Sequence, residues 1–296
     1  MTLTLALNLP DGIVLAADSL QTITAEENAV LTLKTKCKHC GKEDGGNIQI
    51  PRNNNFPGSP YCQKLFNLKG NKGILLDSLA FINGRTIESY IREFDFKLND
   101  DSLSVVEVSE KLIAFLSSIL STNGINNANI GFQLAGFDND FKGKIISANV
   151  GIKCKKETIE DLRLSWRGYN LIINKLLSKL KDETTKQIIP EPTPDLRFMT
   201  IQDGIDYALF FLRTTIDYQR FAIMNITVGG AIDIAIITPH AGFEWIQKKE
   251  LRDENGVSQM RKDNVDSRLL KQIAGHLSGA NKIITPVEIS TKELIK

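Results

Sequence analysis

Histidine is scarce in this sequence, with three residues (His39, His240 and His276) among 296. None of them stands in a context typical of serine or cysteine proteases, so a histidine-based catalytic centre is not indicated. An excess of charge is also missing, because 36 Lys and Arg residues against 35 Asp and Glu residues leave a net charge of +1. A polyanionic partner such as nucleic acid is therefore not expected.

Long hydrophobic runs are absent too. No apolar run reaches the roughly 20 residues that cross a bilayer. The N-terminal segment lacks basic residues and is interrupted by Pro10 and Asp11, so it is a poor signal peptide. Four cysteines are too few for a disulfide scaffold of this size, and we expect a protein of the reducing cytoplasm. Hydrophobic residues at 42% are enough for a sizeable core.

The apolar periodicity predicts strands that alternate with pairs of helices. Strands are expected near residues 2–9, 13–17, 64–66, 73–76, 130–136, 144–146, 231–237 and 242–246. Helices are expected near 83–97, 104–121, 168–180, 201–218 and 265–277, with Thr200 as the N-cap of the fourth. Residues 36–61 are rich in Cys, Gly, Asn and Pro and predict an inserted loop in which the prolines prevent regular pairing. The order fits sheets with helices on their outer faces.

Thr2 is the first candidate for chemistry. Removal of Met1 would place a free α-amino group beside the Thr2 hydroxyl. Such an amine, with an unperturbed pKa near ~8, can act as the base for the hydroxyl without any histidine. Position alone does not distinguish this role from that of a threonine that opens a β-strand.

Several segments resemble the proteasome β subunits, which are N-terminal nucleophile (Ntn) hydrolases. Residues 2–22 begin with Thr, pass an Asp-Gly turn and continue as Val-Leu-Ala-Ala-Asp-Ser, in the same register as that family. Residues 229–237, Gly-Gly-Ala-Ile-Asp-Ile-Ala-Ile-Ile, are close to a second family motif. Weaker similarities lie at 64–66 (Lys-Leu-Phe), 130–138 and 200–208. The start is also similar to the bacterial two-component relative, which is processed by removal of methionine alone.

The resemblance implies a fold and a set of site residues. The fold is an α+β four-layer α-β-β-α sandwich, formed by an Ntn hydrolase domain over residues 1–250 with a Cys-containing insertion at about 36–61. Residues 251–296 are expected to be a charged C-terminal extension. Thr2 matches the nucleophile, Asp18 the buried carboxylate, and Lys34 the lysine, counted from the first residue; Lys36 is a rival for this last place. A lysine beside the hydroxyl would favour its ionised form.

The chain departs from the family pattern at its supporting positions. Asp77-Ser78 stands where the family has an Ala-Gly pair that donates a backbone N–H to the oxyanion, and an acidic neighbour opposes negative charge there. Arg167-Gly168 replaces Ser-Gly, and Val228 replaces a serine before Gly229-Gly230. Asn225 is the nearest candidate for a missing aspartate.

The insertion carries a further motif. Cys37 and Cys40 form a CxxC pair that, with Cys62, supplies three possible thiolate ligands for a structural zinc ion, and Cys154 would be the fourth if the fold brings it near. His39 lies within the turn and is badly placed to share that ion. The alternative is a surface loop with incidental thiols.

The sequence thus predicts a threonine-type peptidase that cleaves peptide bonds of peptides or unfolded proteins through an ester on Thr2, without a catalytic cofactor. Self-association into a homo-oligomeric ring is implied by the resemblance, and an ATPase or other regulatory partner is possible. Two alternatives remain open. One is an inactive scaffold subunit, and the other is an Ntn amidase that acts on a small amide.

Overall fold

The computed structural model describes residues 2–36, 43–125, 128–151, 153–177, 180–181, 188–189, 194–222, 225–252 and 258–259. The chain divides into two compact units, Met1–Lys249 and Glu250–Lys296, and all that follows concerns the first except for one two-stranded sheet of the second. The expected helix at 265–277 lies outside the described residues. No helix in the described part of the chain is long and apolar enough to span a bilayer.

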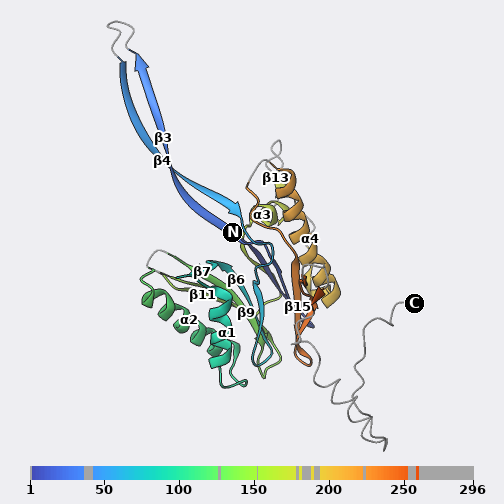
Figure 1. Cartoon of the computed structure of the whole chain (residues 1–296). Helices are drawn as coiled ribbons and strands as arrows, with labels where there is room; N and C mark the ends of the chain where they lie inside the picture. The colour runs from blue at the N-terminus through green and yellow to red at the C-terminus, as the bar shows by residue number, and fades with distance from the viewer. Residues whose placement is uncertain are drawn as a thin grey trace, which may run out of the picture. The chain divides into compact units, whose positions relative to one another are not determined.

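Two five-stranded antiparallel sheets form the centre of the first unit (Figure 1). The first sheet has the order β12-β1-β2-β15-β16, and the second has the order β11-β10-β9-β6-β5. The strands of the first are β1 (Leu3–Leu9), β2 (Gly12–Asp18), β12 (Leu164–Gly168), β15 (Ile232–Thr238) and β16 (Gly242–Gln247). Those of the second are β5 (Leu65–Leu68), β6 (Lys72–Ser78), β9 (Ile130–Phe137), β10 (Gly143–Val150) and β11 (Lys155–Ile159).

Helices cover one face of each sheet, α1 and α2 on the second and α3 and α4 on the first (Figure 1). Their bounds are α1 Ile87–Lys97, α2 Val105–Thr122, α3 Leu171–Leu177 and α4 Ile201–Phe221. Thr200 caps α4 as predicted, since its hydroxyl accepts from the backbone N–H of Asp203 while the Asp203 side chain accepts from the Thr200 N–H.

Alternation along β1 decides which side chains face the site. Leu3, Leu5 and Leu7 are fully buried in the cluster shared with α3 and α4. Ala6 belongs to the cluster between the two sheets, and Thr4 hydrogen-bonds to Gln133 of the second sheet. Because successive strand residues point to opposite faces, the even-numbered threonines look across the gap between the sheets.

The insertion is the largest difference from the predicted strands and helices. Instead of a loop, β3 (Thr22–Lys36) and β4 (Glu43–Pro57) pair residue by residue from Thr22↔Pro57 to Lys36↔Glu43. Pro51 is accommodated opposite Asn28. In a ribbon of two strands, half of the N–H groups face away from the partner, so a proline at such a position costs no ladder hydrogen bond.

The predicted fold class, a four-layer α-β-β-α sandwich, is therefore wrong for this chain. The described residues are mostly sheet, divided among several antiparallel sheets that include the β3–β4 ribbon and the two-stranded pairs β7–β8, β13–β14 and β17–β18. These short strands are β7 (Phe81–Ile82), β8 (Arg85–Thr86), β13 (Leu180–Lys181), β14 (Ile188–Ile189), β17 (Leu251–Arg252) and β18 (Ser258–Gln259). A short 3-10 turn, Leu196–Phe198, precedes α4. The sequence pattern predicts a loop for the insertion and leaves β11 and β12 unassigned, and in these segments backbone pairing between strands decides the structure.

Candidate active site

Thr2 lies immediately before β1 and is 4% exposed. Its hydroxyl Oγ1 donates to Asp18 Oδ1 over 2.6 Å. Its carbonyl oxygen accepts from the N–H of Tyr169 over 2.6 Å. Gly168 makes this approach possible, because its φ is +88° and a Cβ there would stand 1.9 Å from the Thr2 carbonyl oxygen. Thr2 is thus held at both its side chain and its main chain.

Asp18, the last residue of β2, is fully buried and collects hydrogen bonds on both oxygens. Its Oδ1 accepts from Thr2 Oγ1, from the Leu3 N–H (2.9 Å) and from Lys64 Nζ (2.8 Å). Its Oδ2 accepts from the N–H groups of Leu20 (3.2 Å) and Gly229 (3.0 Å). A carboxylate with five donors and no solvent contact has one orientation, and it fixes the Thr2 hydroxyl beside the ammonium group.

The lysine beside Asp18 is Lys64, the residue directly before β5. Its ammonium group, with 8% of the side chain exposed, donates to Asp18 and to the Leu20 carbonyl over 2.7 Å. The structure brings Thr2 and Asp18 together, and the lysine that contacts Asp18 is Lys64 rather than Lys34, the residue that the resemblance favoured. The Lys34 backbone lies on β3 opposite Gly45. At about 3.3 Å per residue, the Lys34 Cα is about 40 Å along that strand from Thr22.

A loop from the end of α4 completes the support of Asp18. The side-chain amide of Gln219, 1% exposed, accepts from the N–H groups of Thr227 (2.7 Å) and Val228 (3.0 Å). These bonds set the position of Gly229, whose own N–H reaches Asp18. Asn225, the sequence's candidate for a supporting aspartate, is exposed.

A second buried ion pair lies on the far side of Asp18. Lys249 Nζ contacts Asp233 on β15 and donates to Ser19 Oγ over 3.0 Å, and its side chain is 6% exposed. Ser19 follows Asp18, and its N–H donates to the Gly229 carbonyl oxygen. The pair therefore fastens the turn after Asp18 to the end of the first unit.

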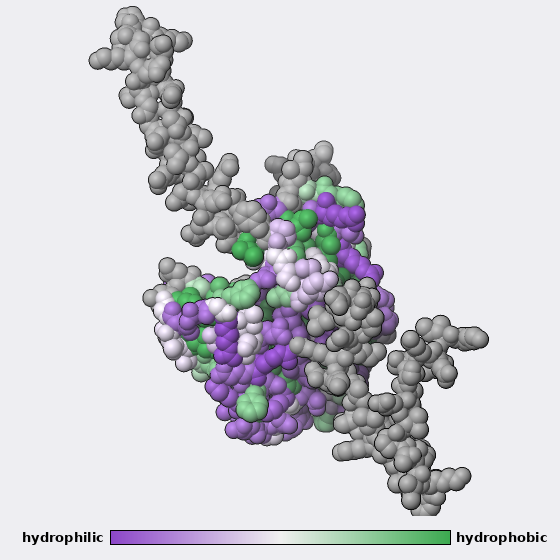
Figure 2. All heavy atoms as spheres, viewed as in Figure 1, coloured by the Kyte–Doolittle hydropathy of each residue, from purple (hydrophilic) through white to green (hydrophobic). Residues whose placement is uncertain are grey.

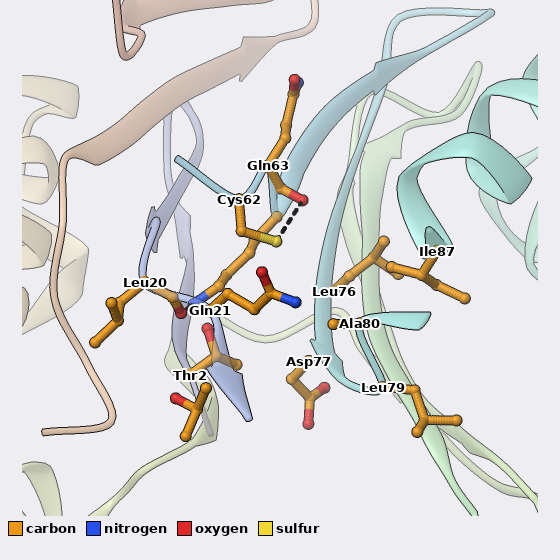
Figure 3. A pocket seen from close by; sticks show the side chains of 12 residues that line it. Thr2, Leu20, Gln21, Cys62, Gln63, Leu76, Asp77, Leu79, Ala80 and Ile87 are labelled. Atoms are coloured by element: carbon orange, nitrogen blue, oxygen red, sulfur yellow. Dashed lines mark hydrogen bonds between the residues drawn. The ribbon is translucent and has the colours of Figure 1, made fainter. Parts of the chain in front are cut away.

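A pocket opens beside Thr2 (Figure 3). Figure 3 shows Thr2 on one wall and a group of apolar side chains on the other, with the Asp77 carboxylate between them in this view. The apolar wall consists of Leu76, Leu79, Ala80 and Ile87. Gln21, Thr22, Cys62 and Gln63 line the rest, together with Leu20 and Lys64. Burial raises the pKa of the Cys62 thiol, against the opposing effect of the Lys64 charge.

The zinc ligands are not assembled in the described part of the chain. Cys37 and Cys40 lie outside the described residues, so zinc at that pair stays a prediction. Cys62 is in the pocket and Cys154 is exposed. Among the described residues, no group of three His, Cys, Asp or Glu side chains is arranged to hold a metal ion.

The chain is similar to known proteins in its structure, whereas comparisons of its sequence find no match. No family model matches the chain, and no curated protein matches it. A solved structure titled as the helical assembly of the Anbu complex from Pseudomonas aeruginosa matches at a TM-score of 0.51 and 12% identity, over 97% of this chain and 98% of that one. Anbu from Hyphomicrobium sp. strain MC1 matches at 0.47 and 12%, over 96% and 100%.

The match at a TM-score of 0.51 shows that the chain shares the fold of the Pseudomonas protein. The expectation that the chain is a proteasome β-subunit-like family member is corrected by these findings. The sequence comparisons give it no family, the structural match is at 12% identity, and the chain is mostly sheet.

Proposed function

We propose that this chain is a proteasome-like Ntn hydrolase whose nucleophile is Thr2, freed by removal of Met1. One observation carries the proposal: the Thr2 hydroxyl and the Lys64 ammonium group meet on the same oxygen of Asp18, at the wall of a pocket. The fold that the chain shares with Anbu, a bacterial proteasome-like protein, also supports an Ntn hydrolase.

The chemistry needs three groups. The free α-amino group of Thr2, with a usual pKa near ~8, takes the hydroxyl proton as the oxygen attacks the substrate carbonyl carbon. The positive charge of Lys64 stabilises the oxygen as it loses that proton. The carbon–nitrogen bond then breaks, and the amine product leaves with the proton. Water hydrolyses the remaining ester on Thr2 and restores the hydroxyl.

The pocket favours a peptide substrate with an apolar side chain. Its apolar wall, Leu76, Leu79, Ala80 and Ile87, faces Thr2 across the opening. Burial of an aliphatic side chain there would supply about 1.5–3 kcal/mol of binding. Peptides and unfolded proteins are thus the proposed substrates, and a small amide with no such side chain would leave this wall unused.

The test compares the wild-type protein with Thr2→Ala and Thr2→Ser. The mass of the purified protein reports whether Met1 has been removed, and fluorogenic peptides with an apolar residue before the cleaved bond report turnover. We expect processed wild-type protein to cleave them, Thr2→Ser to retain part of the activity, and Thr2→Ala to be inactive but folded. An intact Met1 in active preparations, or full activity of Thr2→Ala, would rule out Thr2 as the nucleophile, whereas a folded wild-type protein that cleaves no peptide would favour a scaffold role.

We also propose that the chain forms a homo-oligomer. The Anbu structure to which it is similar is a helical assembly. Exposed apolar side chains gather over α3 and the adjoining part of α4, as Figure 2 shows, where an isolated chain would leave them in water. They are Leu171, Leu176, Phe210, Tyr218 and Phe221. Light scattering should report several copies per particle, and Phe221→Glu should reduce that number; an unchanged monomer in both would refute the assembly.

A further inference from the structure

The two main departures from the family pattern are in direct contact. Arg167 Nε, on β12, lies 2.5 Å from Asp77 Oδ1, on β6. The Arg167 side chain is 14% exposed and that of Asp77 is 10% exposed. Arg167, which replaces a family serine, thus neutralises the carboxylate of Asp77. This is the carboxylate that would otherwise oppose an oxyanion beside Thr2.

The guanidinium group joins the two sheets. Besides Asp77 it donates to Ser147 Oγ over 3.1 Å and to Asn149 Oδ1, both on β10. Gly131 leaves the room for this pair, because a Cβ there would lie 2.2 Å from both the Arg167 guanidinium and the Asp77 carboxylate. The planar guanidinium group of arginine can donate to three acceptors on two strands at once, whereas the ammonium group of lysine is a compact point charge.

The same strand holds Thr2. Arg167 is the cross-strand partner of Thr4, and the next two residues, Gly168 and Tyr169, contact the Thr2 carbonyl oxygen. Asp77 lies in the pocket that Thr2 lines. The ion pair therefore ties the segment that carries Thr2 to the opposite wall of the pocket.

We propose that Asp77 and Arg167 are a charge-compensated pair of positioning residues that sets Thr2 against the pocket wall and keeps the Asp77 charge from opposing the oxyanion. The inference rests on the proposed function. It predicts which of the two single variants loses more activity, whereas a purely structural role of the pair predicts no such order. Loss of Arg167 removes the positive charge that faces the Asp77 carboxylate, whereas loss of Asp77 leaves a cation, which does not destabilise an oxyanion.

The variants are Arg167→Ser, Asp77→Ser, the double variant and Arg167→Lys. The probe is a β-lactone: Thr2 Oγ1 bonds to the lactone carbonyl carbon, the ring carbon–oxygen bond breaks, and the hydroxyl proton ends on the released ring oxygen. The adduct keeps the whole mass of the lactone, so the labelled residue can be located. The concentration dependence of labelling separates probe binding from the maximal rate.

We expect Arg167→Ser to lower the maximal labelling rate on the order of ten- to a hundredfold. Asp77→Ser should lower it less, and the double variant should label faster than Arg167→Ser, because the Asp77 carboxylate is removed as well. Arg167→Lys should recover part of the rate. Equal losses in the two single variants, with no recovery in the double, would overturn the inference.

A matched control is the Lys144–Asp138 pair, at 3.0 Å and with 15% and 14% of the side chains exposed, which does not line the Thr2 pocket. Lys144→Met should change thermal stability but not the labelling rate of Thr2. If wild-type protein with a processed N-terminus is not labelled at Thr2, the proposed function fails and this inference with it. If wild type is labelled and Arg167→Ser is labelled equally fast, only the pairing inference fails.

Discussion

Replacement of Lys64 by methionine removes one buried charge and little volume. The ammonium group makes two hydrogen bonds, to Asp18 Oδ1 and to the Leu20 carbonyl oxygen, and only 8% of the side chain is exposed. The methionine side chain has a length similar to that of lysine, so the effect is chiefly the loss of the partner of Asp18. Asp18 itself has no exposed surface from which water could replace that partner.

The size of the effect follows from what remains around the carboxylate. Breaking a buried ion pair by removing one partner costs about 3–5 kcal/mol. Asp18 retains the four other donors, from Thr2, Leu3, Leu20 and Gly229, so the lower end applies. We expect Lys64→Met to lower the free energy of unfolding by about 3 kcal/mol, which in a unit of this size lowers Tm by about 6–12 °C.

Urea unfolding, with the m-value checked for each variant, measures the change. Asp18→Asn and the double variant complete a cycle in which removal of both charges costs less than the sum of the two single changes. Lys34→Met is the matched control, because it makes the same substitution at the lysine that the sequence favours. It should leave both the stability and the labelling of Thr2 near wild type.

Two results would refute this reasoning. If Lys64→Met unfolds at the wild-type urea concentration, the pair seen between Lys64 and Asp18 does not contribute to the folded state. If Lys34→Met abolishes labelling while Lys64→Met leaves it intact, the site lysine is Lys34 and the assignment from the geometry is wrong.

Two further predictions concern the surroundings of the site. Gln219→Ala leaves the buried N–H groups of Thr227 and Val228 without an acceptor and should lower the free energy of unfolding by about 2–3 kcal/mol in urea. The control Gln202→Ala, at an exposed position on the same helix, should change it by no more than about 0.5 kcal/mol. Equal losses in the two variants would contradict the role of Gln219. Because burial raises the pKa of Cys62 above its usual 9.0, the neutral thiol stabilises the fold below that pH, and this contribution is lost as pH rises through the higher folded value. Alkylation of Cys62 should therefore begin at a higher pH in the folded protein than in the urea-unfolded protein, and identical pH profiles would refute the shift.

The helices show how well apolar periodicity predicts the bounds of local structure. α2 and α4 begin and end within three residues of the predicted bounds, since both carry apolar residues at helical spacing and a capping box at the N-terminus. β12 is missed because Leu164–Gly168 is short and half-buried, and its partner among the described strands is β1, more than 150 residues earlier in the chain. No local pattern contains that pairing.

Thr2 and Asp18 can be singled out from the sequence because the resemblance to proteasome β subunits covers both in one hairpin, where the turn at Asp11-Gly12 sets the register over a few residues. Lys64 cannot be found by counting, because the β3–β4 ribbon inserts a long stretch of chain between Asp18 and the lysine that reaches it. The Lys-Leu-Phe similarity at residues 64–66 was the signal available for it. In the sequence, Arg167 and Asp77 are two separate departures from the family pattern. Only the packing of one sheet on the other brings them together as a neutral pair. Local chemistry determines which residues can react, whereas long-range packing decides which charges meet, because Coulombic and hydrogen-bond partners are chosen by distance in space.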